Sequence, residues 1–497
     1  MAVLFVNEAR RYAKINRNIY GHFTEHLGNC IYGGIYVGED SAIANVRGIR
    51  SDVVEALKKI RVPIVRWPGG CFAEYYSWLD GIGPKENRKC IVNTSWGGVT
   101  EDNSFGTHEF LDFCEQVGCE PYITGNVCAG NPRELSDWLD YVNFAGKSPM
   151  SDLRRANGRE EPWKVRYVGI GNENWGGGGN MRPEYYADLF RQFASYVRRN
   201  NRGLYTVACG ANGADYEWTE KLMQLVGRRM SGLALHFYTM PEYYANIERW
   251  PWEKKGPATG FDLGNYYRTL TRTLDMDTLI ARTRAIMDIY DPEQKVDLVV
   301  DEWGAWHLPE PGTNPGFLFQ QNTMRDAIVA AVNLNIFNTH SERVTMANLA
   351  QMVNVIQSVV LTKGPEMVLT PTYHVFDLYK AHQDATRIES HVQQDLVGTE
   401  ETQVPALHAS ASVDEEGRVH VTVANLCATQ AQSIRGVLEG RRFGSVKVRY
   451  IAGDMNDYNA FGKAAKVFVR DMPDVSLCDN GFEMQMPACS VVEITLE

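Results

Sequence analysis

The sequence predicts an α/β protein: a (β/α)8 TIM barrel with a C-terminal antiparallel β-sandwich of jelly-roll-like form. Three observations support this prediction. Between residues 19 and 384, short apolar runs alternate with segments of helical periodicity. Polar residues stand where the apolar runs end. After residue 385, polar and apolar residues alternate between turn residues, as is typical of antiparallel strands.

The apolar runs are nearly continuous, which favours parallel strands buried on both faces. Eight such runs over this length match the usual size of a (β/α)8 barrel with insertions. We expect its strands within residues 19–28, 62–70, 119–127, 163–173, 205–212, 232–239, 295–304 and 343–354. Helices are expected at 51–60, 107–118, 132–143, 185–199, 278–290 and 323–337. The Gly/Pro-rich segment 250–265 is expected to be a loop inserted after the sixth strand.

The alternating segments of the second domain lie at 402–427, 445–461 and 482–497. They predict antiparallel strands, most simply a sandwich. The opening run Ala2–Val6 is also strand-like, so we expect it to pair into the same sheet. The predicted domains are therefore a catalytic barrel, residues 19–384, and a sandwich made of residues 1–18 plus 385–497.

Composition limits the classes of partner. The formal net charge is -11 and no basic block is present, which argues against a nucleic acid or an anionic membrane. The 10 cysteines show neither CxxC pairs nor zinc-type Cys/His spacing, so we expect free thiols, no metal and no cofactor. The N-terminal apolar run is too short for a signal peptide, and no run approaches a membrane span. We expect a cytoplasmic protein that contacts no membrane.

Polar side chains follow the apolar runs throughout the predicted barrel. In such a barrel the C-terminal ends of all strands meet at one face, which carries the active site. The sequence therefore predicts that these side chains converge. They are Glu25, Arg66, Asn126, Asn172, Glu173, His236, Tyr238, Glu302 and Gln351.

Two of these residues are glutamates in similar surroundings, each with a tryptophan beside it. Glu173 ends the fourth predicted strand and Glu302 the seventh, which places them across the mouth of the barrel. Hydrolysis of a glycosidic bond needs one carboxylic acid and one carboxylate, and a separation of about 5 Å indicates a retaining mechanism. A single glutamate at a strand end is more simply a solvated loop charge, but two in this setting predict a catalytic pair.

Four glycines, Gly176 to Gly179, follow the first of these glutamates. We expect them to permit φ > 0 and a close approach of the backbone, so that the chain turns at once into a helix without blocking the pocket. A flexible linker is the alternative interpretation.

Two long motifs carry a resemblance to a known family. They are GIGNENWGGGGNMRPEYYADLF, residues 169–190, and LVVDEWGAWHLPEPGTNPGF, residues 298–317. Both are similar to the acid/base and nucleophile segments of family 51 glycoside hydrolases, the α-L-arabinofuranosidases. Other segments of the barrel, such as VRWPGGCFAEYYSWLDGIGP, resemble the same family in the same order. The resemblance implies that Glu173 is the general acid/base and Glu302 the nucleophile.

The same resemblance implies further roles. Glu25 would bind sugar hydroxyls, Asn172 would bind the 2-hydroxyl, and Arg66 would hold the nucleophile ionised and aligned. The remaining substrate-binding positions are His236, Tyr238 as a hydrogen-bond donor to Glu302, Gln351, the aromatic walls Trp96 and Trp306, and Cys71, where many members carry Asn. Four of these have plainer alternatives: an Arg66–Glu25 structural pair, a core histidine at His236, a barrel-lining amide at Gln351 and a small packed residue at Cys71.

The sequence thus predicts an exo-acting, retaining glycosidase that releases α-L-arabinofuranosyl groups from arabinan- or arabinoxylan-derived oligosaccharides. A related β-D-galactofuranosidase or β-xylosidase on the same site is one alternative, and the thiol at Cys71 leaves that choice open. A catalytically silent sugar-binding or sensor protein is an alternative of a different class. By resemblance alone, the chain is expected to form a homo-oligomer, a hexamer.

Overall fold

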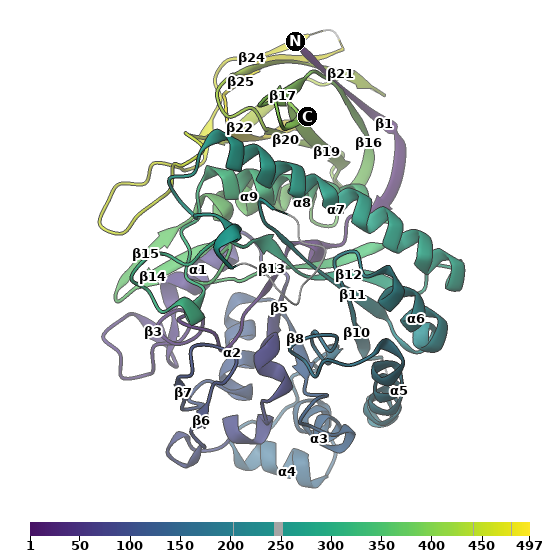
Figure 1. The fold of residues 1–497 in the computed structure, drawn as a ribbon, viewed down its shortest axis with the longest axis vertical. Helices are drawn as coiled ribbons and strands as arrows, with labels where there is room; N and C mark the ends of the chain where they lie inside the picture. Colours follow the sequence, from purple (N-terminus) through teal and green to yellow (C-terminus); the bar gives the residue numbers. More distant parts are fainter. Residues whose placement is uncertain (202, 243–251, 441, 479) are drawn as a thin grey trace.

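The computed structural model describes residues 1–201, 203–242, 252–440, 442–478 and 480–497. A closed barrel with its surrounding helices forms one part of the molecule, and a large curled sheet forms the other (Figure 1). Both chain ends lie in the sheet part, at the top of the view. Within the described residues, no helix combines the length and apolar character needed to cross a membrane.

The barrel is a closed ring of eight parallel strands, which confirms the predicted fold class. Around the ring the strands are β2 (Gly21–Phe23), β5 (Ile64–Trp67), β8 (Glu120–Gly125), β9 (Tyr167–Ile170), β10 (Tyr205–Asn212), β11 (Gly232–Thr239), β12 (Asp297–Ala305) and β13 (Val344–Ala350). Seven strands fall within their expected segments, and β12 extends one residue past its segment, to Ala305. Pairing of β13 with β2 closes the ring, so all strand ends that carry the predicted polar residues face the same way.

Five helices match the predicted positions: α1 (Ser51–Lys59), α2 (Thr107–Val117), α3 (Pro132–Asn143), α5 (Pro183–Asn200) and α8 (Met324–Thr339). The sixth, α7 (Leu263–Tyr290), begins far earlier than expected, because Asp262 caps it by accepting a hydrogen bond from the Asn265 N–H. The loop prediction for 250–265 was therefore wrong at its end. A 3₁₀ turn occupies Trp252–Lys255, and residues 250 and 251 lie outside the described residues.

Three helices were not predicted: α4 (Pro149–Ala156), α6 (Tyr216–Val226) and α9 (Pro371–Tyr379). Every residue of α9 is buried, so its sequence lacks the polar face by which a surface helix is recognised. Helix α8 is also buried along almost its whole length. It packs against barrel strands on one side and against the curled sheet on the other, and Asn335 accepts hydrogen bonds from Ser410 and Thr422 of that sheet.

The second part of the molecule is one curled ten-stranded sheet. In spatial order its strands are β23 (Arg470–Asp471), β22 (Val446–Ala452), β26 (Ser490–Leu496), β20 (Val419–Asn425), β19 (Leu407–Val413), β16 (Thr386–Gln393), β1 (Ala2–Lys14), β21 (Gln432–Glu439), β25 (Gly481–Met486) and β24 (Val475–Cys478). Strand β1 joins this sheet, as the sequence predicted. Side chains such as Leu4, Val421 and Phe482 form its core.

One feature of this sheet corrects the prediction, because the sheet is mixed and not purely antiparallel. Strand β1 runs antiparallel to β16 but parallel to β21. It enters from the far end of the chain, so no hairpin connection dictates its direction relative to β21. Four short two-stranded sheets complete the strands: β3 (Asn45–Val46) with β4 (Ile49–Arg50), β6 (Ile91–Val92) with β7 (Thr100–Glu101), β14 (Val360–Lys363) with β15 (Glu366–Leu369), and β17 (Leu396–Gly398) with β18 (Gln403–Pro405).

The barrel requires glycine where β10 passes β11. A Cβ atom at Gly210 would lie 1.5 Å from the Ala234 carbonyl oxygen, and that oxygen belongs to backbone that cannot rotate away. We expect Gly210→Ala to lower the free energy of unfolding by about 1–3 kcal/mol or more. Gly444→Ala is the matched control, since its nearest neighbour would be 3.8 Å away. Urea unfolding followed by tryptophan fluorescence measures both, and equal midpoints would contradict the prediction.

Candidate active site

The predicted site residues come together at the C-terminal ends of the barrel strands. Eight of them line one cavity: Glu25, Cys71, Trp96, Glu173, Tyr238, Glu302, Trp306 and Gln351. The other three, Arg66, Asn172 and His236, line a second pocket that shares Glu173 with this cavity. Asn126 is the exception among the residues at strand ends. Its side chain closes its own turn, accepting hydrogen bonds from the N–H groups of Ala129 and Gly130.

Glu302, on β12, is buried and held by three partners. Arg66 donates from Nη1 to its Oε1 at 2.7 Å, and the Tyr238 hydroxyl donates to its Oε2 at 2.7 Å. His236 Nδ1 lies 3.6 Å from the same Oε2. Burial opposes ionisation, but the charges of His236 and Arg66 outweigh it and hold the pKa of Glu302 below its usual range. The site therefore keeps this carboxylate charged.

Arg66 links Glu302 to the neighbouring strands. Its Nη2 donates to Asn172 Oδ1 at 2.6 Å, and its Nε lies 3.3 Å from Asp301 Oδ2. Both acidic neighbours come from β12, so the alternative in which Arg66 pairs with Glu25 is wrong. The guanidinium also lies 4.6 Å from the centroid of the Phe23 ring. Its orientation is thus fixed by groups from three strands or strand ends.

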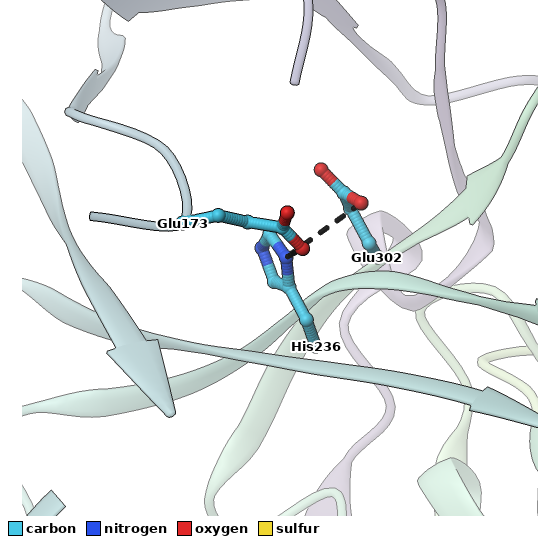
Figure 2. A group of neighbouring side chains, drawn as sticks. All are labelled: Glu173, His236 and Glu302. Carbon is cyan, nitrogen blue, oxygen red and sulfur yellow. Dashed lines mark hydrogen bonds and ion pairs between the residues drawn. The ribbon is translucent and has the colours of Figure 1, made fainter. Parts of the chain in front are cut away.

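Glu173 follows β9 and points toward Glu302 from the opposite side of the site (Figure 2). Its Oε1 lies 3.0 Å from His236 Nδ1, and Cys71 Sγ lies 3.8 Å from its Oε2. One oxygen of Glu173, one oxygen of Glu302 and a nitrogen of His236 all lie within 4.8 Å of one another. A spacing of this size is close to the roughly 5 Å carboxyl separation of retaining glycosidases.

His236 lies between the two glutamates, so it is more than a core histidine. Burial lowers its pKa, but the charge of Glu302 and the hydrogen bond with Glu173 outweigh burial and raise the pKa above its ordinary value. The imidazole is therefore a proton-bearing contact shared by both carboxylates. Tyr238 stands two residues further along β11 and so faces the same side of that strand.

Glu25 has neutral partners instead. It accepts hydrogen bonds from Trp96 Nε1 at 2.9 Å, the Phe72 N–H at 3.0 Å and Gln351 Nε2 at 2.9 Å. Burial exceeds the effect of these donors and raises the pKa of Glu25 to about 7. Gln351 is therefore not only a barrel-lining amide, because it orients a carboxylate in the cavity.

The walls of the cavity include aromatic rings and one thiol. Trp306 packs edge-to-face on Tyr238, with ring centroids 4.9 Å apart, and Lys255 Nζ lies 3.3 Å from the centroid of a Trp306 ring. Cys71 lines the cavity beside Glu173, and burial raises the pKa of its thiol well above its ordinary value. It therefore presents a neutral, weakly polar surface.

Comparison with known proteins identifies the family. A model described as "Alpha-L-arabinofuranosidase 1 domain" matches residues 56–255, and one described as "Alpha-L-arabinofuranosidase C-terminal domain" matches residues 301–490. The intracellular exo-α-L-arabinofuranosidase of Bacteroides ovatus is 47% identical over 491 residues, which cover 97% of this chain and 93% of that protein. The chain belongs to the α-L-arabinofuranosidases of glycoside hydrolase family 51. It is thus a glycosidase.

Solved structures of this family agree with the whole fold. The GH51 arabinofuranosidase from Xanthomonas axonopodis pv. citri has a TM-score of 0.96 at 45% identity, covering 100% of this chain and 99% of that one. The α-L-arabinofuranosidase of Thermotoga maritima, in its arabinose complex, has a TM-score of 0.83 at 30% identity, with 100% and 99% covered.

The glycine loop of this family 51 chain differs from its prediction. Of the four glycines only Gly179 has a positive φ, 111°, whereas Glu173 itself has φ 45°. The close approach was predicted correctly, because a Cβ at Gly178 would lie 1.9 Å from the Asn172 carbonyl oxygen. The helix does not follow at once, since α5 begins only at Pro183.

Two buried acidic residues near the site, Asp301 and Glu74, were not predicted from the sequence. Asp301 accepts hydrogen bonds from the Tyr122 hydroxyl at 2.9 Å and Asn348 Nδ2 at 2.8 Å, and it contacts Arg66. Asp301 could have been recognised from the sequence, because it is a charged residue inside the otherwise apolar run of β12. Glu74 accepts hydrogen bonds from the loops that follow β8 and β9, and no strand end marks its position.

Glu25 should titrate near neutral pH. Burial raises the pKa of Glu25 in the folded protein. At low pH the carboxyl group is protonated in both the folded and the unfolded state, so burying it then costs no stability from ionisation. The cost appears as the pH rises above the usual pKa of a glutamate and is complete once the pH passes about 7. We expect the carboxylic-acid C=O band in the infrared difference between wild type and Glu25→Gln to disappear with a midpoint near pH 7. A midpoint near the usual value would contradict this.

The cluster of Glu173, His236 and Glu302 has a geometry that could also hold a metal ion. Their ligand atoms already contact one another or Arg66, so we expect acid–base chemistry without a metal. Dialysis against EDTA should leave the rate of aryl α-L-arabinofuranoside hydrolysis unchanged. A loss of rate that Zn²⁺ or another divalent ion restores would show the opposite.

Proposed function

We propose that the protein is a retaining, exo-acting α-L-arabinofuranosidase in which Glu302 is the nucleophile and Glu173 the general acid/base. The observation that carries this proposal is the spacing of the two carboxylates. One oxygen of Glu173 lies within 4.8 Å of one oxygen of Glu302. At that distance one oxygen can reach the anomeric carbon while the other reaches the glycosidic oxygen, and no space remains for a water between them.

The surroundings of Glu302 support its role as nucleophile. A nucleophilic carboxylate must be charged and fixed, and Arg66 and Tyr238 each hold one of its oxygens. In the first step a Glu302 oxygen forms a bond to the anomeric carbon as the bond to the leaving oxygen breaks. The charge on Glu302 is consumed in the covalent intermediate, and Arg66 remains balanced by Asp301 at 3.3 Å.

Glu173 would act as acid and then as base. It gives its proton to the leaving oxygen, and in the second step it takes a proton from the water that attacks the anomeric carbon and releases Glu302. His236, 3.0 Å from Glu173 Oε1, supports both steps because it can donate a hydrogen bond to the carboxylate form.

The remaining residues would bind the sugar. Glu25, Asn172 and Gln351 present polar atoms to the cavity for the ring hydroxyls, and Trp96 and Trp306 supply aromatic walls. The cavity is bounded on several sides by loops of the barrel, which suits the terminal sugar of a chain better than an internal one. The related protein of Bacteroides ovatus is named as an exo-acting enzyme, which supports the same choice.

The natural substrates and setting are further parts of the proposal. Arabinan- and arabinoxylan-derived oligosaccharides would reach the enzyme in the cytoplasm, and the Bacteroides ovatus relative is named intracellular. Residues 19–384 would form the catalytic domain, with 1–18 and 385–497 as its companion. The assembly would be a homo-oligomer, a hexamer by family resemblance, which light scattering tests directly.

The nucleophile can be identified by trapping. Incubation with a 2-fluorinated aryl α-L-arabinofuranoside should inactivate the enzyme and leave one sugar bound to the peptide that contains Glu302, because the fluorine slows the second step. Peptide mass spectrometry locates the adduct. A label on Glu173 or any other residue would overturn the assignment of roles.

A paired experiment separates an enzyme from a silent sugar-binding protein. We expect Glu302→Ala to lower kcat by at least about a thousandfold, on the scale of losing a covalent nucleophile. Azide should restore turnover and give the azide product of inverted configuration, since azide replaces the missing carboxylate. If wild type never releases sugar while Glu302→Ala still binds it, the binding-protein alternative is correct.

A further inference from the structure

Glu74 is a buried carboxylate that the proposed mechanism does not use. It ends the 3₁₀ turn Cys71–Glu74 that follows β5. Its Oε1 accepts hydrogen bonds from the Asn172 N–H and from Asn174 Nδ2, both at 2.7 Å. Its Oε2 accepts from the N–H groups of Val127 and Cys128, at 2.7 and 2.8 Å. These bonds occupy both oxygens with donors from two other loops.

The three loops so joined follow neighbouring strands of the barrel. Strands β5, β8 and β9 are adjacent in the ring, and the Glu74 carboxylate joins the three loops that follow them. Asn174 extends this link into the glycine loop by donating to the Gly178 carbonyl at 2.8 Å. Gly171, with φ 85°, makes room, since a Cβ there would lie 3.1 Å from Glu74 Oε1.

Glu173 stands between the two residues that Glu74 holds. Asn172 is anchored through its N–H and Asn174 through its side chain, so both neighbours of Glu173 are fixed by one carboxylate. Glu173 has a positive φ of 45°, which non-glycine residues adopt only where surrounding contacts impose it. We propose that Glu74 is a positioning residue that sets the place of Glu173 and so controls proton transfer to the leaving group.

This inference rests on the proposed role of Glu173 as general acid/base. It predicts that a change at Glu74 impairs the acid/base residue and spares the nucleophile, because other residues hold the nucleophile in place. Glu302 is held by Arg66 and Tyr238, and the hydrogen bonds of Glu74 go to other residues, on the loops after β8 and β9. The Asn172 side chain is likewise held by Arg66, so the sugar-binding amide keeps its partner when Glu74 changes.

Only a carboxylate fits this position. An ionised glutamate is purely an acceptor, and all four groups facing it are N–H donors. Glu74→Gln keeps the shape but turns an NH₂ group toward one pair of donors, whichever way the amide is oriented. Burial raises the pKa of Glu74, and its four donors oppose that rise.

The test compares kcat/KM for aryl α-L-arabinofuranosides whose leaving groups range from 2,4-dinitrophenol, which departs without a proton, to phenol, which needs one. For Glu74→Gln we expect kcat/KM to fall about a hundredfold on the phenyl substrate and less than about threefold on the dinitrophenyl substrate. Azide should raise kcat on the dinitrophenyl substrate, because it needs no general base in the second step. Asn174→Ala should change kcat/KM in the same direction by a smaller factor.

Two controls make the result specific. Glu173→Ala should show the same dependence on the leaving group, and if it does not, the proposed function itself fails. Glu493→Gln removes another buried, hydrogen-bonded carboxylate in the sheet domain and should leave that dependence at its wild-type value. If Glu173→Ala shows the dependence while Glu74→Gln and Asn174→Ala lower kcat/KM equally for all leaving groups, or not at all, the positioning role is wrong. Thermal unfolding of each variant confirms that it is folded.

Discussion

The site depends on keeping one carboxylate charged inside a closed barrel. Glu302 is 4% exposed, and burial by itself favours the neutral acid. The charges of His236 and Arg66 outweigh that preference. Breaking a buried pair of this kind by deleting one partner costs about 3–5 kcal/mol. The need for a charged Glu302 determines which side chains the neighbouring strands carry. Strand β5 must present an arginine at its end, and β11 must present His236 and Tyr238 on one face.

Different partners give two carboxylates in one cavity opposite protonation tendencies. Glu25 is surrounded by neutral donors, so burial dominates and its pKa rises to about 7. Glu302 has a guanidinium and an imidazole beside it, and its pKa falls. Environments that separate the pKa values of neighbouring acids are how enzymes divide chemical roles among identical side chains. Here the division leaves Glu302 charged and Glu25 able to exchange a proton near neutral pH.

The sequence was sufficient for the strands and for what stands at their ends, because both are local signals. Apolar runs located all eight barrel strands, and the strand-end rule placed Glu25, Arg66, Glu173 and Glu302 at one face. Helix α9 was not predicted, because it is buried on all sides and its sequence therefore lacks the alternation of polar and apolar positions that reveals a surface helix. The role of Glu74 was not predicted for another reason. Its hydrogen-bond donors lie 53 to 100 residues further along the chain, and only folding brings them close to it.

The position of Glu173 shows why a motif alone does not make a catalytic site. Four glycines follow in the loop, yet only Gly179 among them has a positive φ, and the non-glycine residues Glu173 and Asn180 also have positive φ, 45° and 50°. A left-handed non-glycine residue costs about 1 kcal/mol or more, so contacts elsewhere must compensate. The glycines provide space, as at Gly178 against the Asn172 carbonyl, while hydrogen bonds from neighbouring loops provide the constraint. The strand thus delivers the glutamate to the right end of the barrel, and the loops set its final orientation toward Glu302.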